Sequence, residues 1–179
     1  IYGLSKYEAE VGLREIATQT GMELVVLRPP LIYGPGVKAN FQSLMRALAR
    51  GIPLPLGALQ NRRSLVALGN IVDLIVTCIK HPAAVNETFF VSDGEDLSTT
   101  ELIRRLAVAM GRPACLVPVP SMALTIGLTL LGKREVAARL CGTLLVNITK
   151  VRQLLGWAPP ISVDEGLRRT AEYFIQHQQ

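Results

Sequence analysis

The stretch Glu23-Leu24-Val25-Val26-Leu27-Arg28-Pro29-Pro30 decides the fold class of this chain. Its short β-branched apolar run is typical of a buried parallel strand, and the prolines end the strand because they cannot continue a central ladder. Residues 4–20 carry apolar positions at helical spacing and are followed by Gly21, which predicts a helix. A helix followed by a buried strand is half of a βαβ unit, so we expect an α/β fold with partner strands upstream.

Short helices and strands are predicted along the rest of the chain. Gly34-Pro35-Gly36 predicts a loop over residues 31–40, and Asn70 is a candidate N-cap for the helix over 70–80. We expect helices at 41–50, 98–110, 135–140, 149–155 and 163–176, strands at 63–68 and 87–91, and extended segments at 52–57 and 116–120.

The most apolar segment is Met122 to Leu131. A helix needs about 20 apolar residues to cross a bilayer, so this segment is too short to span one. We therefore expect no membrane span, and we interpret the segment as a buried helix. A shallow contact with a membrane surface is the alternative.

The composition is that of one globular domain. Of the 179 residues, 49% are hydrophobic and 18% are charged, which argues against disorder. The 19 Lys and Arg exceed the 14 Asp and Glu, but they are scattered, which favours local anion sites over nucleic-acid binding. We expect Cys78, Cys115 and Cys141 to be buried reduced thiols of a cytoplasmic protein, and the two separated histidines argue against a metal site.

The first motif with a chemical implication is Tyr2-Gly3-Leu4-Ser5-Lys6. Residues four apart lie on one face of a helix, and an ammonium near a phenol lowers the pKa of the phenol. Tyr2 could then exchange a proton with a hydroxyl during hydride transfer, while Lys6 tunes it. By itself the motif is weak, since a surface tyrosine beside a solvated lysine gives the same pattern.

A second motif strengthens the first. Leu27-Arg28-Pro29-Pro30-Leu31-Ile32-Tyr33-Gly34-Pro35-Gly36 places a rigid loop directly after the buried strand, where doubly wound sheets bind ligands. With the Tyr/Lys helix, this order resembles the extended short-chain dehydrogenase/reductase family, the nucleotide-sugar epimerases and dehydratases. The resemblance continues through Leu155-Gly156-Trp157 to Glu165-Gly166-Leu167.

The resemblance implies a two-part architecture. Residues 1–37 would be the end of a dinucleotide-binding Rossmann domain, the C-terminal portion of a doubly wound parallel sheet. Residues 38–179 would form a smaller, mostly helical substrate domain, with about 63–80 returning to the Rossmann part. No Gly-rich phosphate loop occurs in the sequence, so we expect a fragment that is inactive alone and binds NAD(H) poorly.

The resemblance also implies the cofactor and catalytic residues. Tyr2 would transfer the proton, and Lys6 would tune it and hold the ribose of NAD, with NADP as an alternative. Pro29, Pro30 and Leu31 would flank the nicotinamide. The family helix that contains the Tyr/Lys pair commonly forms a homodimer interface, so the same is expected here.

A UDP-sugar is the substrate that the resemblance implies. Its nucleotide and diphosphate would contact Asn40, Phe41, Leu54, Pro55, Leu56, Arg63 and Arg139. Arg63 could instead be an ordinary surface cation, and Asn40 could be a helix cap. The chain departs from the family at Gly69 and Asn147, where an acidic residue is usual, and both changes look structural.

The activity expected from the resemblance is epimerisation at sugar C4. The alternatives are a UDP-4-keto-sugar reductase or a dehydratase of polysaccharide biosynthesis. A function of another class, a non-catalytic module that senses a nucleotide, is disfavoured because both Tyr2 and Lys6 are present.

Overall fold

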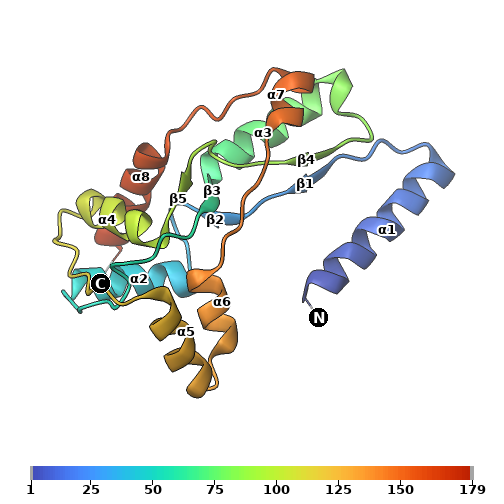
Figure 1. The fold of residues 1–179 in the computed structure, drawn as a ribbon. Coiled ribbons are helices and arrows are strands. Elements are labelled where there is room, and N and C mark those ends of the chain that lie inside the picture. Colours follow the sequence, from blue (N-terminus) through green and yellow to red (C-terminus); the bar gives the residue numbers. More distant parts are fainter. Residues whose placement is uncertain (1, 178–179) are drawn as a thin grey trace.

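The computed structural model describes residues 2–177, with side chains from residue 3 onward. Along the chain the elements are α1 (Tyr2–Thr20), β1 (Val26–Arg28), β2 (Leu31–Tyr33), α2 (Ala39–Ala49), β3 (Arg63–Ala67), α3 (Leu68–Lys80), the 3-10 turn η1 (Pro82–Ala84), β4 (Thr88–Phe90), β5 (Asp96–Leu97), α4 (Thr99–Ala109), α5 (Ser121–Leu130), α6 (Arg134–Cys141), α7 (Thr149–Leu155) and α8 (Val163–Gln176). Figure 1 shows α1 along one side of the molecule and the α5–α6 hairpin projecting from one end.

Two small sheets confirm the predicted α/β fold. β1 pairs in parallel with β4, and β2 pairs in parallel with β3, whose other edge pairs antiparallel with β5. The downstream strand β4 therefore gives β1 a parallel partner within this chain. The prediction of a loop over 31–40 is wrong for Leu31–Tyr33, because these residues pair with β3 from Leu31–Leu65 to Tyr33–Ala67. The prolines before β2 and the glycines after it conceal so short a strand.

Two hydrophobic clusters form the core. One lies where α2, α4 and α8 meet β2 and β3, and the other surrounds β4 with α3 and α7. Trp157 belongs to the second cluster and donates from Nε1 to Oδ2 of Asp73 at 2.7 Å, so it is a core residue. β3 contributes Leu65 to the first cluster and Val66 to the second, so the two clusters share this strand. The predicted domain boundary at residue 37 stays a prediction.

Helix ends follow the sequence in two places and depart from it in a third. Ser98 caps α4 by accepting from the backbone N–H of Glu101 at 3.0 Å, as predicted, and α8 has the predicted bounds. Asn70 is not a cap, because α3 begins at Leu68 and the Asn70 side chain is fully buried. Its amide serves a tertiary contact instead of the helix end.

Two predictions of burial are wrong. The segment predicted to be a buried helix forms α5, which has no buried residue. Cys78 is buried, but Cys115 is exposed and Cys141 is half-buried, because the extended segment before α5 lies at the surface. Among residues 2–177, no helix is long and apolar enough to cross a membrane, and no cluster of three potential metal ligands occurs.

Candidate active site

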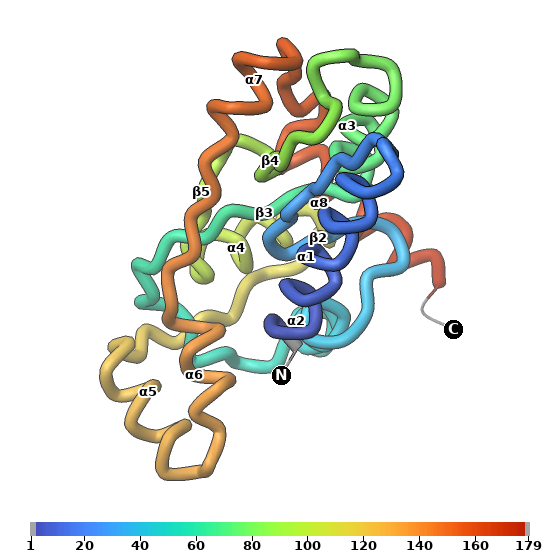
Figure 2. Tube along the Cα trace, turned by 90° about the vertical axis from the view of Figure 1, so that its right-hand side faces the viewer, coloured from blue at the N-terminus to red at the C-terminus, as the bar shows by residue number. Residues whose placement is uncertain are grey.

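α1 carries the Tyr/Lys motif at its N-terminal end. Positions 2 and 6 lie on one continuous helix, as the sequence predicts, and Lys6 is exposed. The side chain of Tyr2 lies outside the described residues, so the pairing of the two side chains stays a prediction. In both views the N-terminal end of α1 is directed toward the part of the molecule that carries α2 and α6 (Figures 1 and 2).

An ion-pair network holds α1 against the strand that follows it. Glu10 on α1 accepts from Nη2 of Arg28, at 2.8 Å to Oε2, and from Nη2 of Arg14 at 2.9 Å. Hydrogen bonds from Arg28 and then Arg14 lower the pKa of Glu10 below its ordinary value. Because Arg28 is the last residue of β1, the network fixes the Tyr/Lys helix to the carboxyl end of that strand. The sequence analysis did not identify Glu10. The signal available in the sequence was an acidic residue on the helix that precedes a strand ending in Arg28.

The residues predicted to flank the nicotinamide follow β1 directly. Pro29 and Leu31 are exposed and Pro30 is half-buried. Leu31 also opens β2, which fixes its backbone beside Leu65 of β3. The segment is thus rigid and solvent-facing at the carboxyl end of a parallel strand, the edge where α/β sheets bind cofactors. Their contact with the nicotinamide of NAD stays a prediction.

A buried polar cluster stands behind this edge. The carboxylate of Asp93 accepts from the hydroxyl of Tyr33 at 2.8 Å, the amide of Asn70 at 2.7 Å and the backbone N–H of Ala67 at 2.8 Å. Burial raises the pKa of Asp93, although these three donors oppose the shift. Burial and the neighbouring carboxylate of Asp93 raise the pKa of Tyr33, so its phenol stays protonated. The cluster joins the ends of β2, β3 and β4 and supports the site without facing it.

The two arginines predicted to bind diphosphate lie together. Nη1 of Arg63 donates to the carbonyl of Arg139 and, at 3.4 Å, to that of Gly142. Asn61 donates to the carbonyls of Leu140 and Gly142, both at 3.1 Å. Arg63 and Asn61 therefore hold the C-terminal end of α6 and place Arg139 beside Arg63. Asn61 was not predicted, because its role depends on a contact far along the chain.

The Arg139 side chain is 67% exposed and reaches Glu135 at 3.5 Å. This exposure leaves its guanidinium accessible to an anionic ligand. Planar guanidinium N–H groups match phosphate oxygens. The contact joins the Arg63 guanidinium to the Arg139 backbone, so binding of one diphosphate by both side chains stays a prediction.

The segment containing Leu54, Pro55 and Leu56 is extended, as predicted. Leu54 donates its N–H to the carbonyl of Cys115 and accepts from the N–H of Val117, both at 2.8 Å. The carbonyl of Leu56 accepts from the hydroxyl of Thr100 at 2.6 Å, and the Leu56 side chain is buried. These bonds occupy the backbone N–H and carbonyl of Leu54 and the carbonyl of Leu56, so Pro55, which is exposed, is the accessible member of the segment.

Asn40 and Phe41 lie in the first turn of α2 but face different surroundings. Asn40 is exposed and sits inside the helix, so it is not the N-cap, a position that Lys38 occupies. Phe41 is buried and stacks on Tyr33 with ring centroids 5.9 Å apart. Phe41 therefore packs the core, and its side chain is not available to a substrate.

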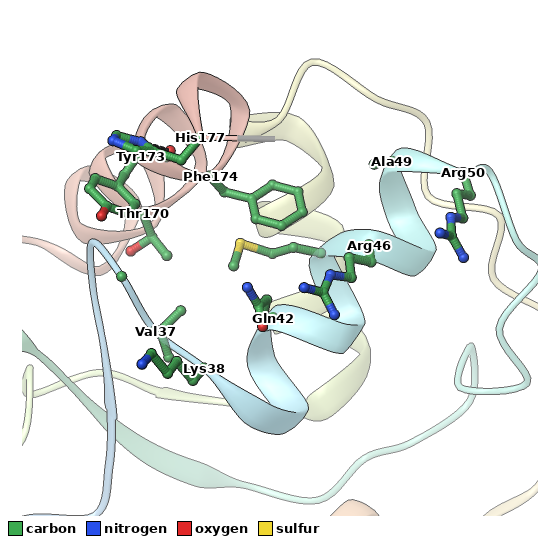
Figure 3. A pocket seen from close by; sticks show the side chains of 12 residues that line it. Val37, Lys38, Gln42, Arg46, Ala49, Arg50, Thr170, Tyr173, Phe174 and His177 are labelled. Atoms are coloured by element: carbon green, nitrogen blue, oxygen red, sulfur yellow. Dashed lines mark hydrogen bonds between the residues drawn. The ribbon is translucent and has the colours of Figure 1, made fainter. Parts of the chain in front are cut away.

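A large cavity lies away from all of these residues. It measures about 620 Å³ between α2 and α8, and Figure 3 shows Arg46 and Gln42 on one wall and Tyr173 on the other. None of the predicted site residues lines it. Its lining includes the cations Lys38, Arg46 and Arg50, so this cavity and the predicted catalytic residues occupy different places.

Comparison with known families decides where the chain belongs. Residues 1–92 match the model of the NAD dependent epimerase/dehydratase family. The chain is a member of this family. The match includes the Tyr/Lys helix and strands β1 to β4, with Arg28 and Arg63. It ends before α6.

Similar proteins support the same assignment. A UDP-glucose 4-epimerase of Vibrio cholerae is 52% identical over 98% of this chain and 54% of its own length. An N-acetyl-α-D-glucosaminyl-diphospho-ditrans,octacis-undecaprenol 4-epimerase of Escherichia coli O157:H7 is 30% identical over 98% of the chain and 57% of its own. The epimerase/dehydratase chain described here thus spans about half the length of these relatives.

Solved structures show the same fold. The UDP-glucose 4-epimerase of Thermotoga maritima with UDP-glucose matches with a TM-score of 0.74, at 23% identity over 99% of this chain and 54% of that one. The UDP-glucuronic acid 4-epimerase of Bacillus cereus with NAD matches with a TM-score of 0.76, at 20% identity over 99% and 51%. These likenesses confirm that this family member has the fold of the Rossmann-type epimerases.

Proposed function

We propose that the protein containing this chain is an NAD-dependent 4-epimerase that acts on a hexose linked to a diphosphate, with a UDP-hexose as the first candidate. The observation that carries the proposal is the 52% identity with a UDP-glucose 4-epimerase over nearly the whole chain. The E. coli relative, by its name, is also a 4-epimerase of a diphosphate-linked hexose. A diphosphate-linked hexose is therefore the substrate class common to both.

In this proposal the α1 motif supplies the acid and base. The phenolate oxygen of Tyr2 accepts the proton of the sugar O4 hydroxyl as C4 becomes a ketone, and it returns a proton to O4 when the ketone is reduced from the other face. Lys6 favours the phenolate form through its charge. Bound NAD supplies the hydride acceptor and donor at C4. Pro29 and Leu31, held at the end of β1, limit where the nicotinamide can lie.

The two arginines supply the anchor. Nη1 of Arg63 donates to the carbonyls of Arg139 and Gly142 at the end of α6, and these bonds fix the backbone of Arg139. The exposed guanidinium of Arg139, with the remaining N–H groups of Arg63, would bind the diphosphate. The sugar can then turn over between the two half-reactions while the diphosphate stays bound, which is what inversion at C4 requires.

The experiment uses the full-length protein that contains this chain, incubated with NAD and either UDP-glucose or UDP-N-acetylglucosamine. Proton NMR of the sugar region should show the C4 epimer accumulate to an equilibrium mixture. Consumption of NAD(P)H with a UDP-4-keto-sugar and no epimerisation would favour the reductase. Loss of water from the sugar would favour the dehydratase, and binding without turnover would favour a sensor.

A further inference from the structure

α5 is largely apolar and yet has no buried residue. Its sequence, Ser-Met-Ala-Leu-Thr-Ile-Gly-Leu-Thr-Leu, contains no charged side chain. Helices that are apolar all round normally lie in a protein core or in a membrane. In this structure Met122, Ile126, Leu130 and Leu131 are 74%, 54%, 83% and 72% exposed. The apolar surface of α5 therefore needs a partner that the described residues do not provide.

The exposed side chains form one stripe. Met122, Ile126 and Leu130 are spaced four residues apart, so they share one face of the helix. Leu124 and Leu128 lie on the opposite face and are half-buried, and Leu124 packs against the core. α5 thus uses one face to attach to the body and presents the other to the surroundings.

Backbone hydrogen bonds close α5 at the tip of the hairpin. Gly132 has φ +71°, and its N–H donates to the carbonyl of Thr129 at 3.0 Å. The N–H of Lys133 donates to the carbonyl of Leu128 at 2.8 Å. These two bonds are the Schellman pattern that closes a helix, and they hold Leu130 and Leu131 at the tip. The last turn of α5 therefore has two of its carbonyls paired, with the apolar Leu130 and Leu131 beside them.

Cations accompany the apolar stripe on the same hairpin. The hairpin itself, residues 121–141, has three cations, Lys133, Arg134 and Arg139, and a single acid, Glu135. Lys133 and Arg134 stand at the tip itself, exposed and without an ion pair among residues 2–177. An apolar stripe with neighbouring cations is complementary to a layer of anionic groups that covers an apolar interior.

We propose that the α5–α6 hairpin docks onto the surface of an anionic phospholipid bilayer. The stripe of Met122, Ile126 and Leu130 enters the boundary between headgroups and acyl chains, and Lys133 and Arg134 bind lipid phosphates. α5 has ten residues, about 15 Å of helix at 1.5 Å per residue, so it lies in the interface and does not cross the bilayer. Figures 1 and 2 show the hairpin projecting beyond the rest of the molecule, so the tip can reach a flat surface.

The test is sedimentation of the full-length protein with vesicles of phosphatidylethanolamine and phosphatidylglycerol, and with vesicles of phosphatidylcholine alone. The variant Ile126→Ser/Leu130→Ser removes two of the three apolar side chains of the stripe. The matched control, Val108→Ser/Ile175→Ser, removes two apolar side chains of similar exposure, 79% and 52%, on α4 and α8. We expect the wild type and the control to bind the anionic vesicles, and the stripe variant to bind at least about tenfold more weakly.

The charged residues give a second arm. Lys133→Gln/Arg134→Gln should weaken binding to anionic vesicles and reduce its salt dependence, whereas Lys80→Gln/Arg112→Gln should change neither. The proposal is overturned if the wild type binds neither kind of vesicle or if the stripe variant binds as well as the control. It is also overturned if the stripe variant dissociates a dimer in the absence of lipid, which would make the stripe a contact between two copies. Because no readout is enzymatic, failure here is distinguishable from failure of the epimerase proposal.

Discussion

Arg28, the last residue of β1, donates from Nη2 to both carboxylate oxygens of Glu10 on α1, at 2.9 Å to Oε1 and 2.8 Å to Oε2. Nε of Arg28 adds a third bond to Oε2 at 3.1 Å. One ion pair thereby joins the helix that carries Tyr2 and Lys6 to the strand end that is followed by Pro29. Glu10 is a positioning residue in this account, because it touches neither substrate nor cofactor.

Replacing Glu10 tests this positioning. Glu10→Gln keeps the size of the side chain and weakens the charge-assisted bonds to Arg28. Because small misplacements of a reacting group slow chemistry more than binding, we expect kcat to fall by roughly three- to tenfold with little change in KM. Steady-state kinetics of the full-length protein would measure the two constants. Glu172→Gln, which removes a carboxylate from an exposed pair on α8, serves as the control. Equal losses in both variants would refute a positioning role.

The pKa of Glu10 predicts how acid affects folding. Its hydrogen bonds, first from Arg28 and then from Arg14, hold the folded-state pKa below the ordinary value of 4.5. The stabilisation by Glu10 is therefore complete above that ordinary value and is lost as the pH falls through the lower folded-state pKa. We expect the difference in Tm between wild type and Glu10→Gln to be largest near neutral pH and to narrow below about pH 4.5. Thermal melts across this range would measure it, and a difference that grows in acid would contradict the assignment.

Arg139 and Arg62 offer a matched pair for the diphosphate anchor. Their side chains are 67% and 65% exposed, and each reaches a carboxylate at 3.5 Å. Arg139→Gln should raise KM for the UDP-sugar about tenfold without changing Tm, since a charged hydrogen bond contributes about 1.5–3 kcal/mol. Arg62→Gln should leave KM unchanged. Isothermal titration with UDP would give the same order of affinities, and unaltered UDP binding in Arg139→Gln would remove this residue from the site.

The buried hydroxyl of Tyr33 is expected to stabilise the fold. Tyr33→Phe preserves the stacking on Phe41 and removes the donor at 2.8 Å from Asp93. Because the Asp93 carboxylate stays buried with one donor fewer, unfolding should become easier by about 1–3 kcal/mol. Denaturant titration of the full-length protein would measure the loss. Tyr173→Phe, on a half-exposed ring of α8, should cost far less. A Tyr33→Phe variant as stable as wild type would show that the hydroxyl is not needed.

Sequence periodicity predicted the elements that have a clear signal of their own. The amphipathic pattern of residues 163–176 and the capping pair Ser98 and Glu101 are local features, and both agree with the structure. β2 was missed because three residues between proline and glycine signals leave no measurable alternation. α5 was expected in the core because a largely apolar helix is normally buried. The sequence pattern does not tell whether it is buried by protein or by lipid.

The parts of the site that the sequence could not predict depend on long-range contacts. Asp93 acquires its importance from Tyr33 and Asn70, and nothing in its own neighbourhood indicates that three strands converge on it. The pairing of Arg63 with the end of α6 likewise joins residues far apart in sequence. Resemblance to the family suggested both arginines, whereas the structure supplied the contact that brings them together.

The central claim is that position 2 supplies the acid and base of a C4 epimerisation. The most direct measurement compares the kcat of the full-length protein with that of its Tyr2→Phe variant, using UDP-glucose and NAD. Tyr7→Phe, on the same helix and 62% exposed, is the control. We expect a loss of about 100-fold or more for Tyr2→Phe and none for Tyr7→Phe. Near wild-type epimerisation by Tyr2→Phe would contradict it.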